Sequence, residues 1–337
     1  MDILFVKTSS LGDVIHSMPA ITDARRRLPD ARLAWIVEEA FAPLVRLHPA
    51  VDEVIPIAAR RWRGALHLVS TWREMKANVR AIRAREYDEI IDCQGLLRTA
   101  VITKLVRGRR RHGYDARSVR ETLASRFYDL HHSVGWDLHA VVRNRLLTGL
   151  ALGYSPEGPI DFGLDRTALT VNPATNRAIL LHGTARAYKE WPCECWIALG
   201  QALNERGMEV VLPWGTDAER QRSETIAAQL ARARVPERRP LDRIAQLIAG
   251  ASLVIGVDTG LLHLAAALGV PVIAIFVGTE PDLNGPKGAG TIEVVGGKSA
   301  VPPVAAVVDR LDKILDTGSA EFTVRTRQAI NSAPGCR

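Results

Sequence analysis

Short apolar runs alternate with longer amphipathic patterns along almost the whole chain, in two successive series. The runs of the first series predict strands at Ile3–Val6, Leu33–Val37, Val54–Ile57 and Glu89–Cys93. Those of the second predict strands at Ala178–Leu181, Glu209–Leu212, Leu253–Val257 and Val272–Phe276. Near-continuous apolar strands separated by helices are typical of parallel sheets covered on both faces. The chain is therefore expected to be an α/β protein of two doubly wound, Rossmann-like domains facing a central cleft.

The segments between the strands carry helical periodicity. In the first series the predicted helices are Val14–Leu28, Ala40–Leu47, Thr71–Arg85 and Leu96–Leu105. In the second series they are Trp196–Arg206, Asp217–Ala231, Leu241–Ala249, Leu262–Leu268 and Val304–Asp316. Turn-forming residues at Gly153–Pro159 begin the linker between the series. We expect an N-terminal domain at 1–165, a C-terminal domain at 166–318, and a helix and tail at 319–337 that can return to the N-terminal domain.

All of the net positive charge lies in the first half of the chain. Residues 1–160 hold 25 Lys and Arg against 18 Asp and Glu, whereas residues 161–337 hold 19 of each. This asymmetry predicts two halves with different partners, one of them anionic and extended. Nucleic acid is one such partner. Aromatic residues are only 5% of the chain, which leaves few rings to stack on bases and disfavours that interpretation.

The cysteines and the apolar runs bear on the cellular compartment. The four cysteines form no C-x-x-C pair and no zinc cluster, so no metal site is predicted, and scattered thiols suit a reducing cytoplasm. No run approaches the roughly 18 apolar residues of a membrane span, and the start is too short and charged for a signal peptide. The sequence predicts a cytoplasmic protein, soluble or peripheral to a membrane.

The first predicted strand leads directly into a polar loop, Lys7–Asp13. In an open parallel sheet this loop lies at the carboxyl edge, where ligands bind. Gly12 permits close backbone approach, and Ser9 and Ser10 offer hydroxyls. Asp13 stands at the start of the next helix, where it can cap the helix or act as a general base at the mouth of the cleft.

Two loops of the second series are suited to a diphosphate. Val257–His263 contains a strand end, a turn at Gly260 and a helix start, which presents free N–H groups to an anion. His263 can reach such an anion or be an ordinary helix histidine, and Asp258 is assigned to capping the turn or bonding a hydroxyl. In the equivalent loop, Lys189 can stabilise a leaving diphosphate or be a solvated loop lysine, and Thr184 offers a hydroxyl.

Basic residues cluster after the third predicted strand. Arg60, Arg61 and Arg63 lie there, and Arg109–Arg111 and Arg120 add to the excess charge. Such runs are either solvated faces or contact surfaces for an anionic partner.

These segments together resemble a known family. Lys7–His16, with Pro19 and Ala20, is closely similar to the opening of the type I ADP-heptose:lipopolysaccharide heptosyltransferases of glycosyltransferase family nine. Further similar stretches follow in the family's order at 35–39, 54–56, 60–63, 92–96, 189–192, 212–215 and 257–263. The resemblance implies a GT-B fold and an inverting transfer that needs no metal or cofactor. The implied reaction moves L-glycero-D-manno-heptose from ADP-heptose to the first Kdo of Kdo2-lipid A.

The resemblance also implies roles for individual positions. Asp13 becomes the catalytic base, with Lys189 stabilising the leaving group. The donor-binding positions are Thr184, Ala185, Lys189, Glu219, Arg239, Asp258, Thr259, Gly260, Leu261 and His263. The acceptor-binding positions are Ser9, Ser10, Gly12, Arg60, Arg61, Arg63 and Arg120. Ala185 stands where a second threonine is common, and Arg239 falls near a position that is often apolar beneath the adenine.

The resemblance further implies a monomer that works peripherally at the cytoplasmic face of the inner membrane, with no nucleic acid as partner. Two alternatives stay open. One is another heptosyltransferase of the same family. The other is a nucleotide-sugar hydrolase or epimerase on the same fold, which needs the donor site but has no use for the Arg60–Arg63 cluster.

Overall fold

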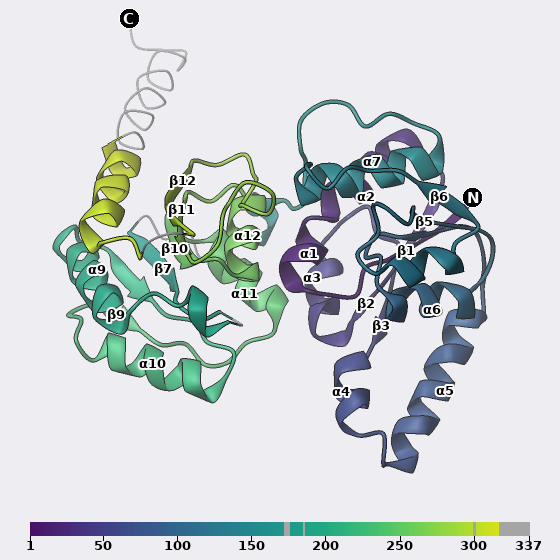
Figure 1. Cartoon of the computed structure of the whole chain (residues 1–337). Helices are drawn as coiled ribbons and strands as arrows, with labels where there is room; N and C mark the ends of the chain where they lie inside the picture. Colours follow the sequence, from purple (N-terminus) through teal and green to yellow (C-terminus); the bar gives the residue numbers. More distant parts are fainter. Residues whose placement is uncertain (172–175, 185, 299–300, 317–337) are drawn as a thin grey trace, which may run out of the picture.

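The computed structural model describes residues 1–171, 176–184, 186–298 and 301–316, and these form two six-stranded parallel sheets (Figure 1). The first sheet has the order β3-β2-β1-β4-β5-β6. Its strands are β1 (Asp2–Val6), β2 (Arg32–Glu38), β3 (Glu53–Ile57), β4 (Glu86–Asp92), β5 (Arg107–Tyr114) and β6 (Leu130–His132). Odd and even residues of β1 enter different cores, because Ile3 and Phe5 face one side of the sheet and Leu4 and Val6 the other.

The second sheet has the order β12-β11-β10-β7-β8-β9. Read from the β9 edge, this is the same topology as that of the first sheet. Its strands are β7 (Arg177–Leu181), β8 (Glu209–Val211), β9 (Ala233–Arg234), β10 (Leu253–Val257), β11 (Val272–Val277) and β12 (Ile292–Gly297). In each sheet the strand order reverses once, between β1 and β4 and between β7 and β10. Crevices at such reversals are where doubly wound sheets bind ligands.

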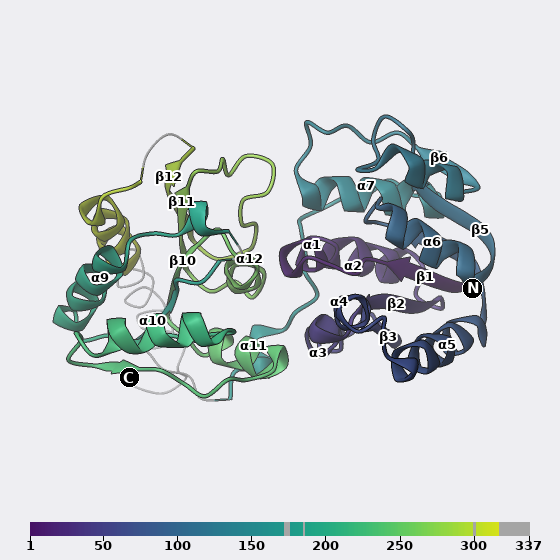
Figure 2. The ribbon, with the colours of Figure 1, turned by 60° about the horizontal axis from the view of Figure 1, so that its bottom comes forward.

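Helices cover both faces of each sheet (Figure 2). The first half contains α1 (Leu11–Ile15), α2 (Met18–Arg27), η1 (Glu39–Phe41), α3 (Ala42–Val45), α4 (Ala59–Gly64), α5 (Val69–Arg83), α6 (Leu97–Leu105), η2 (Thr122–Phe127) and α7 (Ala140–Leu152). The second half contains α8 (Arg166–Leu169), η3 (Ala187–Lys189), α9 (Cys193–Glu205), α10 (Asp217–Ala227), α11 (Leu241–Ala249) and α12 (Gly260–Ala267), and residues 304–316 are also helical. Within the described ranges, none of these helices combines the length and the apolar character that a membrane span requires.

The eight predicted strands are present, but one expected helix was wrong and the strand β5 was not predicted. The single helix expected at Val14–Leu28 is two helices, α1 and α2, because Pro19 in the first turn of α2 cannot continue the hydrogen-bond ladder of α1. The arginine run at 109–111 lies within β5, next to the sheet edge, where its side chains reach solvent or the carboxylates of β4 and Asp129.

The two halves are packed against each other. One continuous apolar cluster includes buried residues of both sheets, and α1 lies against α12 while α3 lies against α11 (Figures 1 and 2). The expected domain division at residue 165 falls within the connection between the sheets and stays a prediction. The expected terminal helix and tail at 319–337 lie outside the described residues.

Candidate active site

The loop after β1 presents Asp13 at the carboxyl edge of the first sheet. The strand ends at Val6 and α1 begins at Leu11, with Ser10 as its N-cap. Both the backbone N–H and the hydroxyl of Ser10 donate to Asp13 Oδ2, at 2.9 and 2.8 Å. The capping role considered for Asp13 is thus present in part, because Ser10 occupies the cap position and Asp13 completes a capping box.

Two cations lie near this carboxylate. Arg120 Nη1 lies 3.8 Å from Asp13 Oδ2, and the buried Lys7 donates from Nζ to the carbonyl of Cys93 at 2.8 Å. Burial raises the pKa of Asp13, but Lys7, Arg120 and the Ser10 hydrogen bonds lower it by more, so it lies below the ordinary 3.8. Asp13 is therefore ionised at neutral pH.

Gln94, which follows β4, holds the loop after β1 in place by hydrogen bonds. Its Oε1 accepts from both the N–H and the hydroxyl of Thr8 at 2.8 Å, and its Nε2 donates to the carbonyl of Ser9. Arg98 donates to the Ser9 hydroxyl at 2.6 Å. Ser9 is therefore held by neighbours on α6 and the β4 loop, and its expected acceptor contact stays a prediction.

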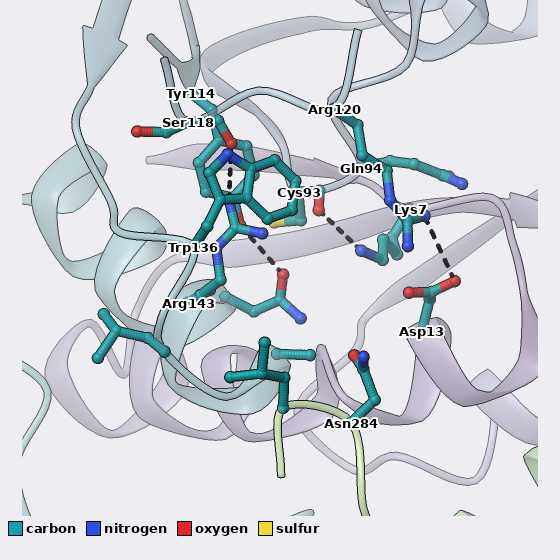
Figure 3. Close-up of a pocket in the computed structure, with 14 residues that line it drawn as sticks. Lys7, Asp13, Cys93, Gln94, Tyr114, Ser118, Arg120, Trp136, Arg143 and Asn284 are labelled. Atoms are coloured by element: carbon teal, nitrogen blue, oxygen red, sulfur yellow. Dashed lines mark hydrogen bonds and ion pairs between the residues drawn. The ribbon is translucent and has the colours of Figure 1, made fainter. Parts of the chain in front are cut away.

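A cavity of about 110 Å³ opens beside Asp13 (Figure 3). Its walls come from both halves of the chain, since Leu283 and Asn284 follow β11 whereas the rest lie on or after strands of the first sheet. The lining residues are Lys7, Asp13, Cys93, Gln94, Tyr114, Ser118, Arg120, Trp136, Leu138, Ala140, Arg143, Asn144, Leu283 and Asn284.

Arg143 is the third cation of this cavity. Its guanidinium carbon lies 3.7 Å from the ring centre of Trp136 and 4.9 Å from that of Tyr114, and Nη2 donates to the carbonyl of Ser118 at 2.7 Å. Its buried Nε has no hydrogen-bond partner among the described residues. The cavity thus combines one carboxylate with Lys7, Arg120 and Arg143, which suits an anionic, hydroxyl-bearing guest.

The donor candidates gather at the carboxyl edge of the second sheet. Lys189 Nζ lies 2.5 Å from Asp258 Oδ2, and the hydroxyl of Thr279 donates to the same oxygen at 3.3 Å. His263 Nε2 lies 3.8 Å from Asp258 Oδ1, and the hydroxyl of Thr184 donates to the Asp258 carbonyl. Burial raises the pKa of Asp258, but the contacts with His263 and Lys189 lower it to about 2.

Helix starts complete this edge. Thr259 is the N-cap of α12, so the N–H groups at Gly260 and Leu261 lie in its first turn, where helix N–H groups have no intrahelical partner. Glu219 caps α10 by accepting from Gly215 and Thr216, and it lies against Gly183 so closely that a Cβ there would be 2.5 Å from Oε1. Lys189 and the start of α12 therefore lie at the same edge of the sheet, an arrangement that suits a diphosphate.

The acceptor and donor loops meet at the helix starts. A Cβ added to Gly12 would lie 3.1 Å from the His263 ring, and one added to Gly260 would lie 2.7 Å from the Cβ of Leu11. His263 Nδ1 is 3.2 Å from the Nε2 of the buried His16. The two glycines are what allow α1 and α12 to approach, which brings Asp13 beside the donor loop.

The remaining candidates lie elsewhere. Arg60, Arg61 and Arg63 are on α4, after the carboxyl end of β3 and so at the same edge as Asp13. Arg239 lines a separate cavity of about 510 Å³ with Arg177, Arg234, Arg243 and neighbouring residues. Ala185 lies outside the described residues. Within the described ranges, no three His, Cys, Asp or Glu side chains gather as ligands of one metal ion.

Lys7, Gln94 and Arg143 were not predicted from the sequence as site residues. Lys7 and Gln94 had a usable signal, because Lys7 directly follows β1 and Gln94 is the second residue after β4, the two strands beside the reversal of strand order. Arg143 had none. It lies on α7, a helix that was not predicted, and tertiary packing alone brings it to the cavity.

Comparison with known proteins agrees with this geometry. The model of glycosyltransferase family 9 (heptosyltransferase) matches residues 75–307. The lipopolysaccharide heptosyltransferase 1 of Pseudomonas aeruginosa is 45% identical over 299 residues, which are 87% of this chain and 83% of that protein. The protein of the same name from Escherichia coli K12 is 42% identical over 292 residues, which are 86% of this chain and 91% of that one.

Solved structures agree as well. The E. coli heptosyltransferase WaaC with ADP has a TM-score of 0.87 at 39% identity, covering 93% of this chain and 100% of that one. The E. coli heptosyltransferase II structure, at 20% identity and a TM-score of 0.76, shares the fold and covers 95% of this chain and 100% of its own. The expected two-domain GT-B architecture is confirmed. On these grounds the chain belongs to glycosyltransferase family 9, the heptosyltransferases.

Proposed function

We propose that this enzyme transfers L-glycero-D-manno-heptose from ADP-heptose to the first Kdo of Kdo2-lipid A, an inner-core step of lipopolysaccharide synthesis. Two relatives named lipopolysaccharide heptosyltransferase 1 are 45% and 42% identical over most of the chain, which supports this reaction. A solved WaaC structure with ADP-2-deoxy-2-fluoro heptose, at 38% identity and a TM-score of 0.84, supports an ADP-sugar as donor.

One observation carries the proposal. The loop with Asp13 and the loop with Asp258 belong to different sheets, yet Gly12 and His263 are in contact across the junction. A carboxylate that can take a proton therefore lies next to a site that can hold a diphosphate. This is the pairing that a glycosyl transfer by single displacement requires.

Asp13 serves as the general base in this mechanism. Ser10 and Arg120 both engage Oδ2, so we assign Oδ1 to the acceptor hydroxyl. The hydroxyl oxygen attacks the anomeric carbon from the face opposite ADP while Asp13 takes its proton. The bond to the diphosphate breaks with its electron pair, and the configuration at the anomeric carbon is inverted. Because the displacement is single, no second carboxylate nucleophile is needed.

The donor loop stabilises the leaving ADP. Charge grows on the diphosphate as the glycosidic bond breaks, and Lys189 and the N–H groups of the α12 start face that charge. Asp258 holds Lys189 in place and also engages Thr279. A cation and a helix start fixed beforehand cost no reorganisation at the moment of reaction.

The acceptor cavity is assigned to the Kdo residue. Kdo carries a carboxylate, and Lys7, Arg120 and Arg143 offer cationic partners around Asp13. A hydrolase or epimerase working on the nucleotide sugar alone has no need of a cationic cavity beside its base. The cavity therefore favours the transferase over those alternatives.

Because the proposed acceptor is a glycolipid, we propose that the enzyme acts at the cytoplasmic face of the inner membrane. We propose further that it acts there as a monomer. The net charge is +7 for residues 1–160 and zero for residues 161–337, which supports an anionic membrane surface as the partner of the N-terminal half.

The test is an assay of ADP release with ADP-heptose and Kdo2-lipid A, beside a control without acceptor. Acceptor-dependent ADP release and a heptosylated product are expected. Equal ADP release without acceptor would favour the hydrolase, and consumption of donor with no ADP release would favour the epimerase.

A further inference from the structure

The helical hairpin of residues 59–83, which comprises α4, α5 and the loop between them, projects from the N-terminal half of the molecule (Figure 1). Four large apolar side chains are exposed at its tip within seven residues. The exposed fractions are 46% for Leu66, 46% for Leu68, 67% for Val69 and 56% for Trp72. Single exposed apolar residues are ordinary on protein surfaces, whereas a contiguous cluster marks an interaction site.

The same hairpin is strongly basic. Residues 59–83 contain seven Arg or Lys residues and one Glu, so they carry six of the chain's seven net positive charges. The hairpin lies beside the acceptor side of the site, since the backbone N–H of Arg60 donates to Glu38 at the end of β2 and Glu39 pairs with Arg61. An apolar tip on a cationic element is the composition of a membrane-surface anchor.

The tip is held in a defined shape. Trp72 Nε1 donates to the carbonyl of Leu66 at 2.8 Å, which fastens the indole across the turn. The N–H groups of Leu68 and Thr71 close successive turns onto Ala65 and Leu68. The apolar side chains are thus presented by an ordered turn, with a tryptophan of the kind found at membrane–water interfaces.

We propose that this hairpin docks the enzyme on an anionic lipid bilayer, with Leu66, Leu68, Val69 and Trp72 inserted at the acyl boundary and the basic residues against the headgroups. The inference deepens the proposed function and rests on it only for the lipid nature of the acceptor. It adds the place at which the chain contacts the bilayer, which is the apolar tip of this hairpin.

Two other occupants fit the hairpin less well. A second copy of the chain packed tip to tip would bring two surfaces of net charge +6 together, which repel. Nucleic acid would satisfy the charge, but three of the four exposed side chains are aliphatic and offer nothing to stack on a base.

The primary experiment measures co-sedimentation of the full chain with vesicles, in the absence of substrates. We use phosphatidylcholine vesicles with about one third phosphatidylglycerol, and pure phosphatidylcholine vesicles for comparison. The wild type is expected to bind the anionic vesicles, and more weakly at high ionic strength. The double variant Val69→Ser with Trp72→Ser is expected to lower vesicle partitioning on the order of tenfold, because it removes apolar surface without changing charge.

The matched control is Leu150→Ser. Leu150 is 51% exposed on α7, and α7 packs on the face of the first sheet opposite to that of the hairpin. The Leu150→Ser variant should therefore bind vesicles like the wild type. Failure of the wild type to sediment with anionic vesicles overturns the proposal, and so does equal binding by the double variant. A wild-type dimer in solution that the double variant converts to monomer also overturns it, because the tip would then be covered by a second copy.

A second measurement separates this proposal from the proposed function. The double variant should retain turnover on a water-soluble, deacylated acceptor and lose it on acceptor embedded in vesicles. Equal losses on both acceptors contradict membrane docking by the tip. If no heptose transfer occurs at all, the reaction assignment fails while the vesicle-binding result stands or falls by itself.

Discussion

At the scale of single residues, the two roles considered for Asp13 are compatible. Ser10 occupies the N-cap position, and its donors engage only Oδ2 of Asp13. One carboxylate oxygen therefore fastens the helix start while the other is assigned to the acceptor hydroxyl. Asp258 likewise has more than one partner, because its side chain pairs with Lys189 and accepts from the hydroxyl of Thr279.

Replacing Asp13→Asn tests the base without removing the cap. Asparagine keeps an oxygen that can accept from Ser10 and cannot take a proton, so kcat should fall by about 10²–10⁴-fold. ADP affinity, measured by calorimetry, should stay close to that of the wild type. Turnover near the wild-type rate with intact ADP binding would show that Asp13 is not the base.

Replacing Lys189→Met tests stabilisation of the leaving group. The variant removes the cation that we propose to stabilise the diphosphate, and it leaves the Asp258 carboxylate without its closest partner, so kcat should fall by about 10²–10³-fold. Lys189→Arg keeps the charge and should recover part of the rate in the same assay. Similar rates for the two variants would mean that the charge at this position does not act in the reaction.

At the scale of elements, the arginines of α4 differ in their ion pairing. Arg61 pairs with Glu39 and Glu74 and so ties α4 to η1 and α5, whereas Arg63 is exposed with no ion pair among the described residues. The sequence grouped the two as one acceptor cluster. Packing separates a residue that holds the element together from one that is available to a partner.

The basic cluster should act on the acceptor more than on the donor. Arg63→Gln should raise KM for Kdo2-lipid A several-fold while ADP-heptose KM stays unchanged, because α4 lies on the acceptor half. Arg61→Gln should in addition lower Tm, since it breaks two ion pairs. Steady-state kinetics with each substrate varied in turn decides between them, and equal losses on both substrates would remove the acceptor assignment.

The contact between α1 and α12 depends on glycine. In Gly260→Val the new Cβ would lie 2.7 Å from the Cβ of Leu11, so the two helix starts must separate. We expect kcat to fall at least about tenfold, because a misplacement of about 1 Å costs catalysis heavily. Far-ultraviolet circular dichroism should be unchanged, and a variant with wild-type kcat would show that this contact does not position the reacting groups.

At the scale of the whole molecule, each half contains a buried neutral histidine. Burial lowers the pKa of His48 in the first half and of His182 in the second to about 4. His48 contacts the Thr22 hydroxyl, and His182 contacts that of Ser223. Both rings are thus held in the uncharged form by their surroundings.

Stability should therefore fall as the pH drops from about 6.5 to 4. In this pH range His48 and His182 are protonated in the unfolded chain but stay neutral in the folded protein. Each histidine can therefore lower the free energy of unfolding by on the order of 2–3 kcal/mol by pH 4. Urea unfolding across this range measures the loss. The exposed His67→Gln variant should show the wild-type slope, and a flat profile for the wild type would contradict the buried, neutral state.

The sequence by itself determined the two series of strands, the loops that follow β1, β7 and β10, and the family. These follow from local patterns, because apolar alternation and turn residues act over a few neighbouring positions. It did not determine β5, whose arginines mask a strand next to the sheet edge, or α7 with Arg143.

Only the tertiary structure decided which of the predicted residues meet. The reversal of strand order brings the β1 and β4 loops together, and the packing of α1 on α12 brings the loop of Asp13 against the loop of Asp258 and His263. These residues are some 250 positions apart in the chain, beyond the reach of any local pattern. The positive charge noted in the sequence likewise acquires a place only in the fold, where it collects on one hairpin with an apolar tip.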